Sequence, residues 1–273
     1  MSRNIEGMVV AITGASAGIG KALVERLHAR GAKIAVCARR AEKLEELNNK
    51  FNRELLCVRA DVAKPSECSL FVLAAAEKFG RIDTLVCNAG YGFVRSVADT
   101  THEEMQKIFE TNVFGTTDII RAAVPIIKRQ SLRDDWRGQI MIVSSAAARR
   151  GLPFFGPYAA TKAAQLSIAE ALRVELKPDR IAVTSVHPVG TDTEFFEVAE
   201  SQTGMKRPVA DTKIRQTAST VARKMVRGME SPKAELWPLR AARWVLGVQV
   251  MMPSLVDRLM AKYHRQIEEI NKP

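Results

Sequence analysis

The chain has 273 residues, 47% of them hydrophobic and 26% charged, a balance that can bury the core of one large α/β domain. Its four cysteines form no C-x-x-C pair and its four histidines show no zinc-ligand spacing, so we expect reduced thiols, a cytoplasmic protein and no metal. The net charge of +11 is concentrated after position 202, where 14 Lys and Arg stand against 6 Asp and Glu without a recognition-helix pattern, which argues against nucleic-acid binding.

Short apolar or β-branched runs alternate with longer amphipathic stretches along most of the chain. Residues 1–7 are too few and too polar for a secretory leader. The pattern predicts strands over 8–13, 33–38, 55–59, 84–87, 139–144 and 181–187, and helices over 18–29, 41–51, 64–79, 101–128 and 157–177. A run at 234–237, stopped by Pro238, adds an edge strand. Such alternation predicts one Rossmann-like, doubly wound parallel sheet of about seven strands with helices on both faces, within a domain spanning 1–238.

A glycine-rich turn follows the first predicted strand and opens the first helix. Glycines at this place permit a tight turn, and the helix N-terminus favours the charge of a pyrophosphate. The alternative is an ordinary glycine-rich turn, but the position between strand and helix favours dinucleotide binding. The candidate cofactor residues here are Gly14, Ser16, Ala17, Gly18, Ile19 and Gly20.

The second predicted strand ends in Arg39 and Arg40, where NAD-binding folds usually carry a carboxylate for the adenosine ribose. Arg39 presents a fork of donors suited to a 2′-phosphate, and Ser16 adds a hydroxyl. The sequence therefore favours NADP(H) over NAD(H). The alternative is that both arginines form the solvated first turn of the next helix.

Tyr158 and Lys162 are four residues apart on a predicted helix and so share one face. A free tyrosine is a poor base at neutral pH, but a nearby ammonium favours the phenolate. Ser145, just beyond a strand, can hydrogen-bond the same substrate oxygen, which two hydroxyls would then polarise. A Tyr-x-x-x-Lys pair alone is common on helix surfaces, so its meaning depends on the neighbouring motifs.

Taken together, these motifs resemble the short-chain dehydrogenase/reductase family over about residues 5–237. The resemblance implies hydride transfer between a nicotinamide and a carbonyl or alcohol carbon, with Tyr158 as general acid/base and Lys162 also binding the nicotinamide ribose. It implies that Asp61 and Val62 contact adenine and that Asn88, Ala89 and Gly90 flank the cofactor. Asn112 would help to hold a water relay from Lys162 to solvent. The helices over 101–128 and 157–177 would form a homodimer or homotetramer.

One motif departs from the family pattern. After the sixth strand the family usually has Pro-Gly-x-(Val or Ile)-x-Thr, whereas this chain has Pro188, Val189 and Gly190, followed by Thr191 and Thr193. The resemblance still implies that these five residues bind the cofactor, with the Thr191 backbone and the Thr193 hydroxyl facing the nicotinamide carboxamide. Because a β-branched residue disfavours positive φ, we expect Gly190 to permit a shifted turn.

Aromatic residues follow the strands on the expected catalytic side and suggest an apolar, lipid-like substrate, although half of the rings would equally suit the core or a subunit interface. The candidates are Phe93, Phe154, Phe155 and Phe195 beside Ser145 and Tyr158, with Tyr91, Pro153 and Phe196 near them. The polar stretch 191–215, which carries Gly204 and Pro208, is expected to be a lid.

Residues 239–273 are expected to form a helical extension that packs on the domain, on a second subunit or on a membrane surface. Basic residues, namely Arg240, Arg243, Arg258, Lys262 and Arg265, alternate there with Trp244, Val245, Leu246, Val248, Val250, Met251, Met252, Leu255, Val256, Leu259 and Met260. The stretch is too short and too interrupted to span a bilayer.

Two hypotheses of function follow. The first is an active reductase or dehydrogenase. The second is a cofactor-binding regulatory or scaffold protein that lacks turnover, which would not require the combination of Asn112, Ser145, Tyr158 and Lys162.

Overall fold

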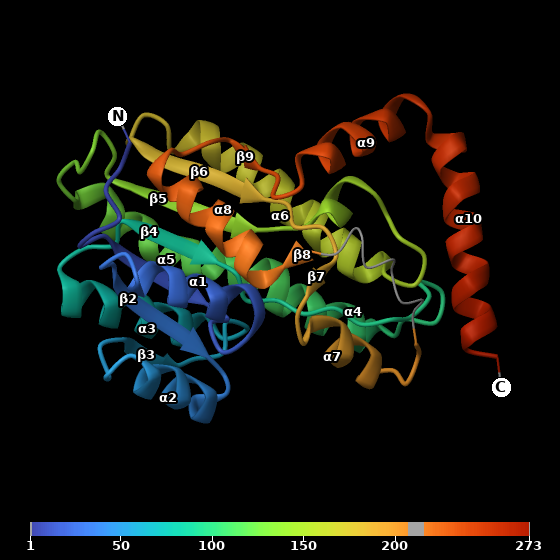
Figure 1. The fold of residues 1–273 in the computed structure, drawn as a ribbon, viewed down its shortest axis with the longest axis horizontal. Helices are drawn as coiled ribbons and strands as arrows, with labels where there is room; N and C mark the ends of the chain where they lie inside the picture. The colour runs from blue at the N-terminus through green and yellow to red at the C-terminus, as the bar shows by residue number, and fades with distance from the viewer. Residues whose placement is uncertain (1, 207–215, 273) are drawn as a thin grey trace.

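The computed structural model describes residues 2–206 and 216–272. Within the second range, only the backbone of residues 248–251 is described. A seven-stranded parallel sheet runs through it in the order β3-β2-β1-β4-β5-β6-β9 (Figure 1). This confirms the predicted doubly wound sheet. Its strands are β1 (Val9–Thr13), β2 (Lys33–Ala38), β3 (Leu56–Arg59), β4 (Thr84–Cys87), β5 (Gly138–Val143), β6 (Ile181–Val186) and β9 (Glu235–Leu236).

Helices cover both faces of this sheet, because its central strands are apolar on both sides. One face packs against α1 (Gly18–His28), α2 (Ala41–Lys50) and α8 (Ala218–Glu230). The other packs against α3 (Pro65–Phe79), α5 (Gly115–Arg129) and α6 (Gly156–Glu175). The carboxyl ends of the strands therefore form one edge between the two helix layers, where ligands bind in open α/β sheets.

The long helix predicted over 101–128 is interrupted. It consists of α4 (His102–Phe109), a π-helical turn at Glu110–Phe114 and α5. Thr101 begins α4 with a capping box to Glu104. The π turn places Asn112 at its centre, and such turns leave backbone carbonyls available to side chains.

Shorter elements lie near the carboxyl edge of the sheet. A 3-10 turn, Ala146–Arg149, follows β5, and α7 (Phe195–Ser201) follows β6. A second small sheet pairs β7 (Thr191–Asp192) with β8 (Gln216–Thr217) in parallel. These elements carry part of the segment expected to act as a lid. Residues 207–215 of that segment lie outside the described residues.

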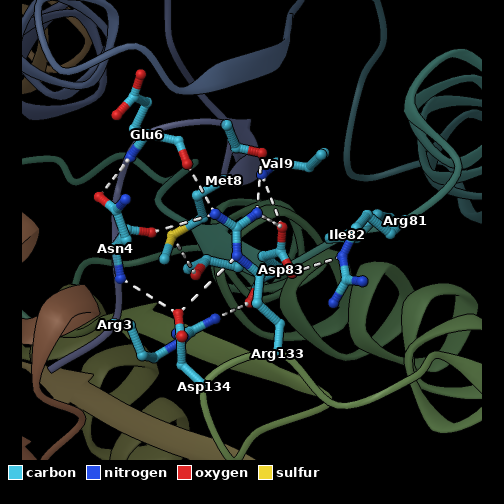
Figure 2. A network of polar contacts seen from close by, with 12 residues as sticks. Arg3, Asn4, Glu6, Met8, Val9, Arg81, Ile82, Asp83, Arg133 and Asp134 are labelled. Carbon is cyan, nitrogen blue, oxygen red and sulfur yellow. Dashed lines mark hydrogen bonds and ion pairs between the residues drawn. The ribbon is translucent and has the colours of Figure 1, made fainter. Parts of the chain in front are cut away.

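The opposite edge of the sheet is held by a buried ionic network (Figure 2). Asp83 is fully buried; its carboxylate accepts from Val9 N at 2.9 Å and pairs with Arg81 at 2.7 Å and Arg133 at 3.3 Å. Arg3 donates to the backbone oxygen of Asp83 at 3.0 Å and to Gln139 at 3.0 Å. Burial lowers the pKa of Arg3 to about 10. The network joins the N-terminal segment to β1, β4 and β5.

Two C-terminal helices, α9 (Arg240–Met251) and α10 (Pro253–Ile270), extend beyond the sheet (Figure 1). Among the described residues, the contacts of α10 with the rest of the molecule include an ion pair of Asp257 with Arg150 and a stack of His264 on Phe154 with centroids 5.2 Å apart. Its C-cap, Asn271, forms paired hydrogen bonds with Lys206. Among the described residues, every helix is too short or too polar to cross a membrane.

Candidate active site

The glycine turn lies at the carboxyl end of β1, against the loop that follows β4. Gly14 has φ +67°, and a Cβ added to it would lie 2.8 Å from Ala89 Cα. A Cβ on Gly20 would lie 2.4 Å from Gly14 O and 2.7 Å from Asn88 Nδ2. No real Cβ tolerates such distances, so close backbone approach requires glycine at both positions.

Asn88 holds this turn in place. Its Nδ2 donates to Thr13 O and to Gly14 O, each at 3.0 Å, and its backbone N donates to Thr13 Oγ1 at 3.0 Å. Ala89 N donates to the same hydroxyl at 3.0 Å. The structure thus brings Asn88 and Ala89 against the glycine turn, whereas Gly90 lies near Asn112 and Lys162.

The N-terminus of α1 fits an anionic group. Its N-cap, Ala17, has no capping side chain, and the first turn of α1 contains no acidic residue; all of this segment is described. The first N–H groups of a helix need an acceptor, and the helix dipole favours negative charge there. Together with the glycine turn, this is a cradle of the kind that binds a pyrophosphate.

Arg40, not Arg39, contacts the glycine turn. Its Nη2 donates to Ser16 Oγ at 3.1 Å, and its Nη1 pairs with Glu194 at 3.1 Å. Arg39 is exposed, and its charge acts to lower the pKa of Tyr91, although burial of that phenol raises it more. The sequence could not distinguish the two arginines, because the conformation at the start of α2 decides which side chain faces the glycine turn.

Asp61 and Val62 follow β3 at the same edge of the sheet. An oxygen of Asp61 accepts from Ala63 N at 3.1 Å, and the side chain is half-buried. Val62 is buried against Gly115, where an added Cβ would lie 2.8 Å from Val62 O. Their expected contact with adenine stays a prediction.

Ser145 and Tyr158 form the centre of the candidate site. Ser145 caps the 3-10 turn, its Oγ accepting from Ala147 N at 3.1 Å. Hydrogen bonding with Ser145 lowers the pKa of Tyr158, but burial outweighs it and raises that pKa to about 12. Burial and Ser145 are the causes that act on this pKa here, and the lowering by Lys162 that the sequence predicted stays a prediction.

Lys162 lies one turn further along α6, with only 4% of its surface exposed. Its Nζ donates to Val143 O and to Gln165 Oε1, each at 2.9 Å. Burial lowers its pKa to about 7, because neither partner carries a negative charge. The amine can therefore gain or lose a proton near neutral pH.

Asn112 is fully buried, and its amide is saturated with hydrogen bonds. Its Nδ2 donates to Tyr91 O and Thr161 Oγ1, and its Oδ1 accepts from Tyr91 N. The carbonyl oxygen of Asn112, freed by the π turn, accepts from Gln165 Nε2 at 2.7 Å. Gln165 thus bridges Asn112 and Lys162 directly. The expected water relay stays a prediction.

The loop after β6 departs from the turn expected of it. Neither Val189 nor Gly190 has positive φ, so the expectation that Gly190 supplies a shifted turn is wrong. Gln216 holds the loop instead: its Oε1 accepts from Val189 N at 3.2 Å and its backbone N donates to Gly190 O at 3.0 Å. A β-branched side chain is tolerated because this backbone needs no left-handed residue.

Further contacts place the same loop near the site. Pro188 O accepts from Ala146 N at 2.9 Å, next to Ser145. Thr191 Oγ1 donates to Val189 O at 2.8 Å. A Cβ on Gly18 would lie 3.2 Å from the methyl of Thr193, so Thr193 packs over the glycine turn.

The expected substrate residues divide into two groups. Phe93 and Phe155 are buried, with 3% and 4% of their surfaces exposed, and belong to the core in this state. Phe195 is half-buried, its ring 5.1 Å from that of Tyr158. Phe154 is half-buried with φ +62° and stacks on His264 of α10.

Several site residues were missed by the sequence analysis, among them Gln165, Gly92 and His187. Gln165 accepts a hydrogen bond from Lys162 and donates one to Asn112 O, and this pairing depends on the packing of α6 against the π turn. Gly92 lies against Tyr158 and Phe195, whose atoms would be 3.1 and 2.8 Å from an added Cβ. His187 Nδ1 lies 3.2 Å from Ser145 O, while its ring stacks on Trp237 at 4.4 Å. Position after β6 was the only sequence signal for His187.

Comparisons with known proteins agree with this geometry. A family model described as short chain dehydrogenase matches residues 8–204. The chain belongs to the short-chain dehydrogenase family. An uncharacterized oxidoreductase, YxnA, of Bacillus subtilis (strain 168) is 31% identical over 274 residues, covering 98% of this chain and 76% of that protein.

Two further family members are informative. 11-beta-hydroxysteroid dehydrogenase 1A of Arabidopsis thaliana is 37% identical over 204 residues, covering 72% of this chain and 56% of that protein. The crystal structure of 3-ketoacyl-(acyl-carrier-protein) reductase from Brucella melitensis, complexed with NADH, has a TM-score of 0.72 and 27% identity, covering 85% of this chain and 97% of that one. The family assignment makes this chain an oxidoreductase that uses a nicotinamide cofactor.

Proposed function

We propose that this short-chain dehydrogenase exchanges hydride between NADP(H) and a carbonyl or secondary alcohol of an apolar substrate. The observation that carries the proposal is the convergence of Ser145, Tyr158 and Lys162 at the carboxyl ends of β5 and the start of α6. These are the groups needed to polarise a carbonyl oxygen and to protonate it.

Each residue has a distinct role in this mechanism. When bound, the nicotinamide supplies or accepts the hydride. The hydroxyl of Tyr158 donates its proton to the substrate oxygen in reduction and receives it in oxidation. Ser145 hydrogen-bonds the same oxygen. Lys162, held by Val143 O and Gln165, stabilises the phenolate when protonated, and Asn112 keeps Gln165 in place.

The preference for NADP(H) rests on cations beside the glycine turn. Arg40 contacts Ser16, Lys43 lies near Arg40, and Arg39 is exposed at the end of β2. Guanidinium groups match the geometry of a phosphate. Arg39→Ala and Arg40→Ala should each weaken NADPH far more than NADH, measured by quenching of protein fluorescence. Equal weakening of both cofactors would contradict the preference.

An apolar substrate is favoured by the aromatic rings near Tyr158, namely Phe154, Phe195 and Phe196. Several relatives carry a hydroxysteroid dehydrogenase name, which is in line with an apolar substrate.

Contact with a membrane surface is proposed for the outer face of α9 and α10. Exposed large apolar side chains, 45–79% exposed, lie along these helices: Trp244 and Val245 on α9, Met252 between the helices, and Leu255 and Leu259 on α10. Arg258 and Lys262, both exposed, lie on the same side of α10, whereas Asp257 and His264 lie on the side that contacts the body. Exposed apolar and basic groups on one face fit an anionic lipid interface.

Co-sedimentation with anionic vesicles tests this face. Leu255→Ser with Leu259→Ser should reduce binding, whereas Leu70→Ser, at an equally exposed position on α3, should not. Equal binding of all variants would remove the membrane proposal and leave the catalytic one intact.

A homodimer or homotetramer is also proposed, through the helices α4, α5 and α6. Two large apolar side chains are exposed in this region, Phe114 at 55% and Val174 at 74%. Light scattering after size exclusion should give a mass that is a multiple of one chain. A monomer at micromolar concentration would contradict this assembly.

The activity itself is tested with a panel of ketones and their alcohols, each with NADPH and NADH. The proposal predicts turnover with apolar ketones and NADPH. If the protein binds NADPH but turns over none of the panel in either direction, the alternative of a silent cofactor-binding protein is favoured.

A further inference from the structure

Glu194 lies between the cofactor cradle and the candidate substrate site. Its carboxylate takes two cations from the start of α2: Oε2 is 3.1 Å from Arg40 Nη1, and Oε1 is 3.4 Å from Lys43 Nζ. The other η nitrogen of Arg40 donates to Ser16 Oγ at 3.1 Å. The Glu194 carboxylate thus forms ion pairs with both Arg40 and Lys43, next to the glycine turn.

These partners have the chemistry of a phosphate site. An arginine, a lysine and a serine hydroxyl lie close together there, and all three can bind a phosphate oxygen. A carboxylate is an anion that the same cations can bind in place of a phosphate. The hydrogen bond with Arg40 and the nearby charges lower the pKa of Glu194, so the carboxylate is ionised at neutral pH. An ionised carboxylate and a phosphate repel each other and cannot share the same two cations.

The neighbours of Glu194 in sequence connect it to the catalytic residues. Thr193 packs over Gly18 of the glycine turn, and Phe195 places its ring 5.1 Å from that of Tyr158. Glu194 is also the N-cap residue of α7. A change in the position of Glu194 is therefore passed to the segment that covers Tyr158.

We propose that Glu194 is a cofactor-specificity residue whose carboxylate competes with the 2′-phosphate of NADP(H) for Arg40 and Lys43. This inference rests on the NADP(H) preference proposed above. A cofactor with a 2′-phosphate has to displace Glu194, whereas NAD(H) leaves the ion pairs in place. Glu194 therefore reduces the advantage that the basic residues give to NADP(H).

The effect should be modest, because the side chains of Arg40, Lys43 and Glu194 are 41%, 38% and 44% exposed. Exposed ion pairs contribute little each, so Glu194→Gln should tighten NADPH binding by about threefold to tenfold. NADH binding should change by less than about twofold, since its ribose carries no phosphate.

Two small nucleotides that lack the nicotinamide measure the effect of the 2′-phosphate alone. Adenosine 2′,5′-bisphosphate and adenosine 5′-monophosphate are titrated calorimetrically into wild type, Glu194→Gln and Glu197→Gln. Glu197 is the matched control, because it is exposed on the next turn of α7. The inference predicts that only Glu194→Gln increases the preference for the bisphosphate over the monophosphate.

The possible failures are distinguishable. If wild type binds both probes equally and Glu194→Gln does too, these cations bind no 2′-phosphate, and the cofactor preference fails along with the inference. If wild type prefers the bisphosphate but Glu194→Gln leaves that preference unchanged, the preference stands and the competition is wrong. If Glu194→Gln weakens the binding of both probes equally, Glu194 helps to hold the nucleotide itself, which also overturns the inference.

Discussion

The Nζ atom of Lys162 lies 5.5 Å from the centre of the Tyr158 ring. Burial acts on the two groups in opposite senses: it lowers the pKa of Lys162 to about 7 and raises that of Tyr158 to about 12. Because a phenolate would be stabilised by the ammonium, their protons are coupled. Lys162 is the member of the pair that titrates near neutral pH.

Carbonyl reduction should therefore slow as pH rises through about 7. Below that pH Lys162 is protonated and can stabilise the phenolate left by proton donation; above it the amine is neutral. An exposed lysine would titrate more than three pH units higher, near its ordinary pKa of about 10.4. The kcat/KM for reduction, measured across this range, should report the transition, because this parameter follows ionisations of the free enzyme.

Lys162→Arg is the matched variant for that profile. Its guanidinium stays charged at every accessible pH, so the relative rate of reduction should vary less with pH than in wild type. A fall at the same pH in both proteins would assign the transition to another group.

Gly92→Ala should reduce turnover by about tenfold or more, because the new methyl would meet Phe195 Cζ at 2.8 Å and Tyr158 Cδ2 at 3.1 Å. The displaced Tyr158 would lose its alignment with Ser145. Gly247→Ala, on α9 with open space around it, is the control and should keep wild-type kcat. Unchanged kcat in Gly92→Ala would show that the rings of Tyr158 and Phe195 move aside freely.

Asp83→Asn should destabilise the fold by about 3–5 kcal/mol, because it leaves Arg81 and Arg133 beside a neutral buried amide. Urea unfolding measures this loss. Asp118→Asn, which breaks an ion pair with the exposed Arg121, should cost less than about 1 kcal/mol. Since Asp83 lies at the sheet edge opposite the site, kcat of the folded Asp83→Asn variant should be nearly normal; a large loss of kcat would contradict this separation.

Much of the fold was predictable, because fully buried parallel strands produce continuous apolar runs. The predicted strands 33–38 and 84–87 agree with β2 and β4 at both ends. The π turn around Asn112 was not predictable. It depends on side chains from α6, including Gln165, that occupy its freed carbonyl, and these are distant in the sequence.

The candidate site was predictable as a set of residues but not in its contacts. The sequence predicted Ser145 just beyond a strand and Tyr158 and Lys162 on one helix, as the structure has them, but not the burial that dominates the pKa values of Tyr158 and Lys162. It offered both Arg39 and Arg40 as cofactor residues but not the contact of Arg40 with Ser16. It gave no sign of Glu194, because the ion pair of Glu194 with Arg40 joins residues 154 positions apart.

Single-turnover reduction of an apolar ketone by Tyr158→Phe tests the central claim most directly. Phenylalanine keeps the ring against Phe195 and removes only the hydroxyl. The account predicts hydride transfer slowed by at least about a thousandfold, with NADPH affinity within about twofold of wild type. Near-normal hydride transfer in this variant would contradict the assignment of Tyr158 as the proton donor.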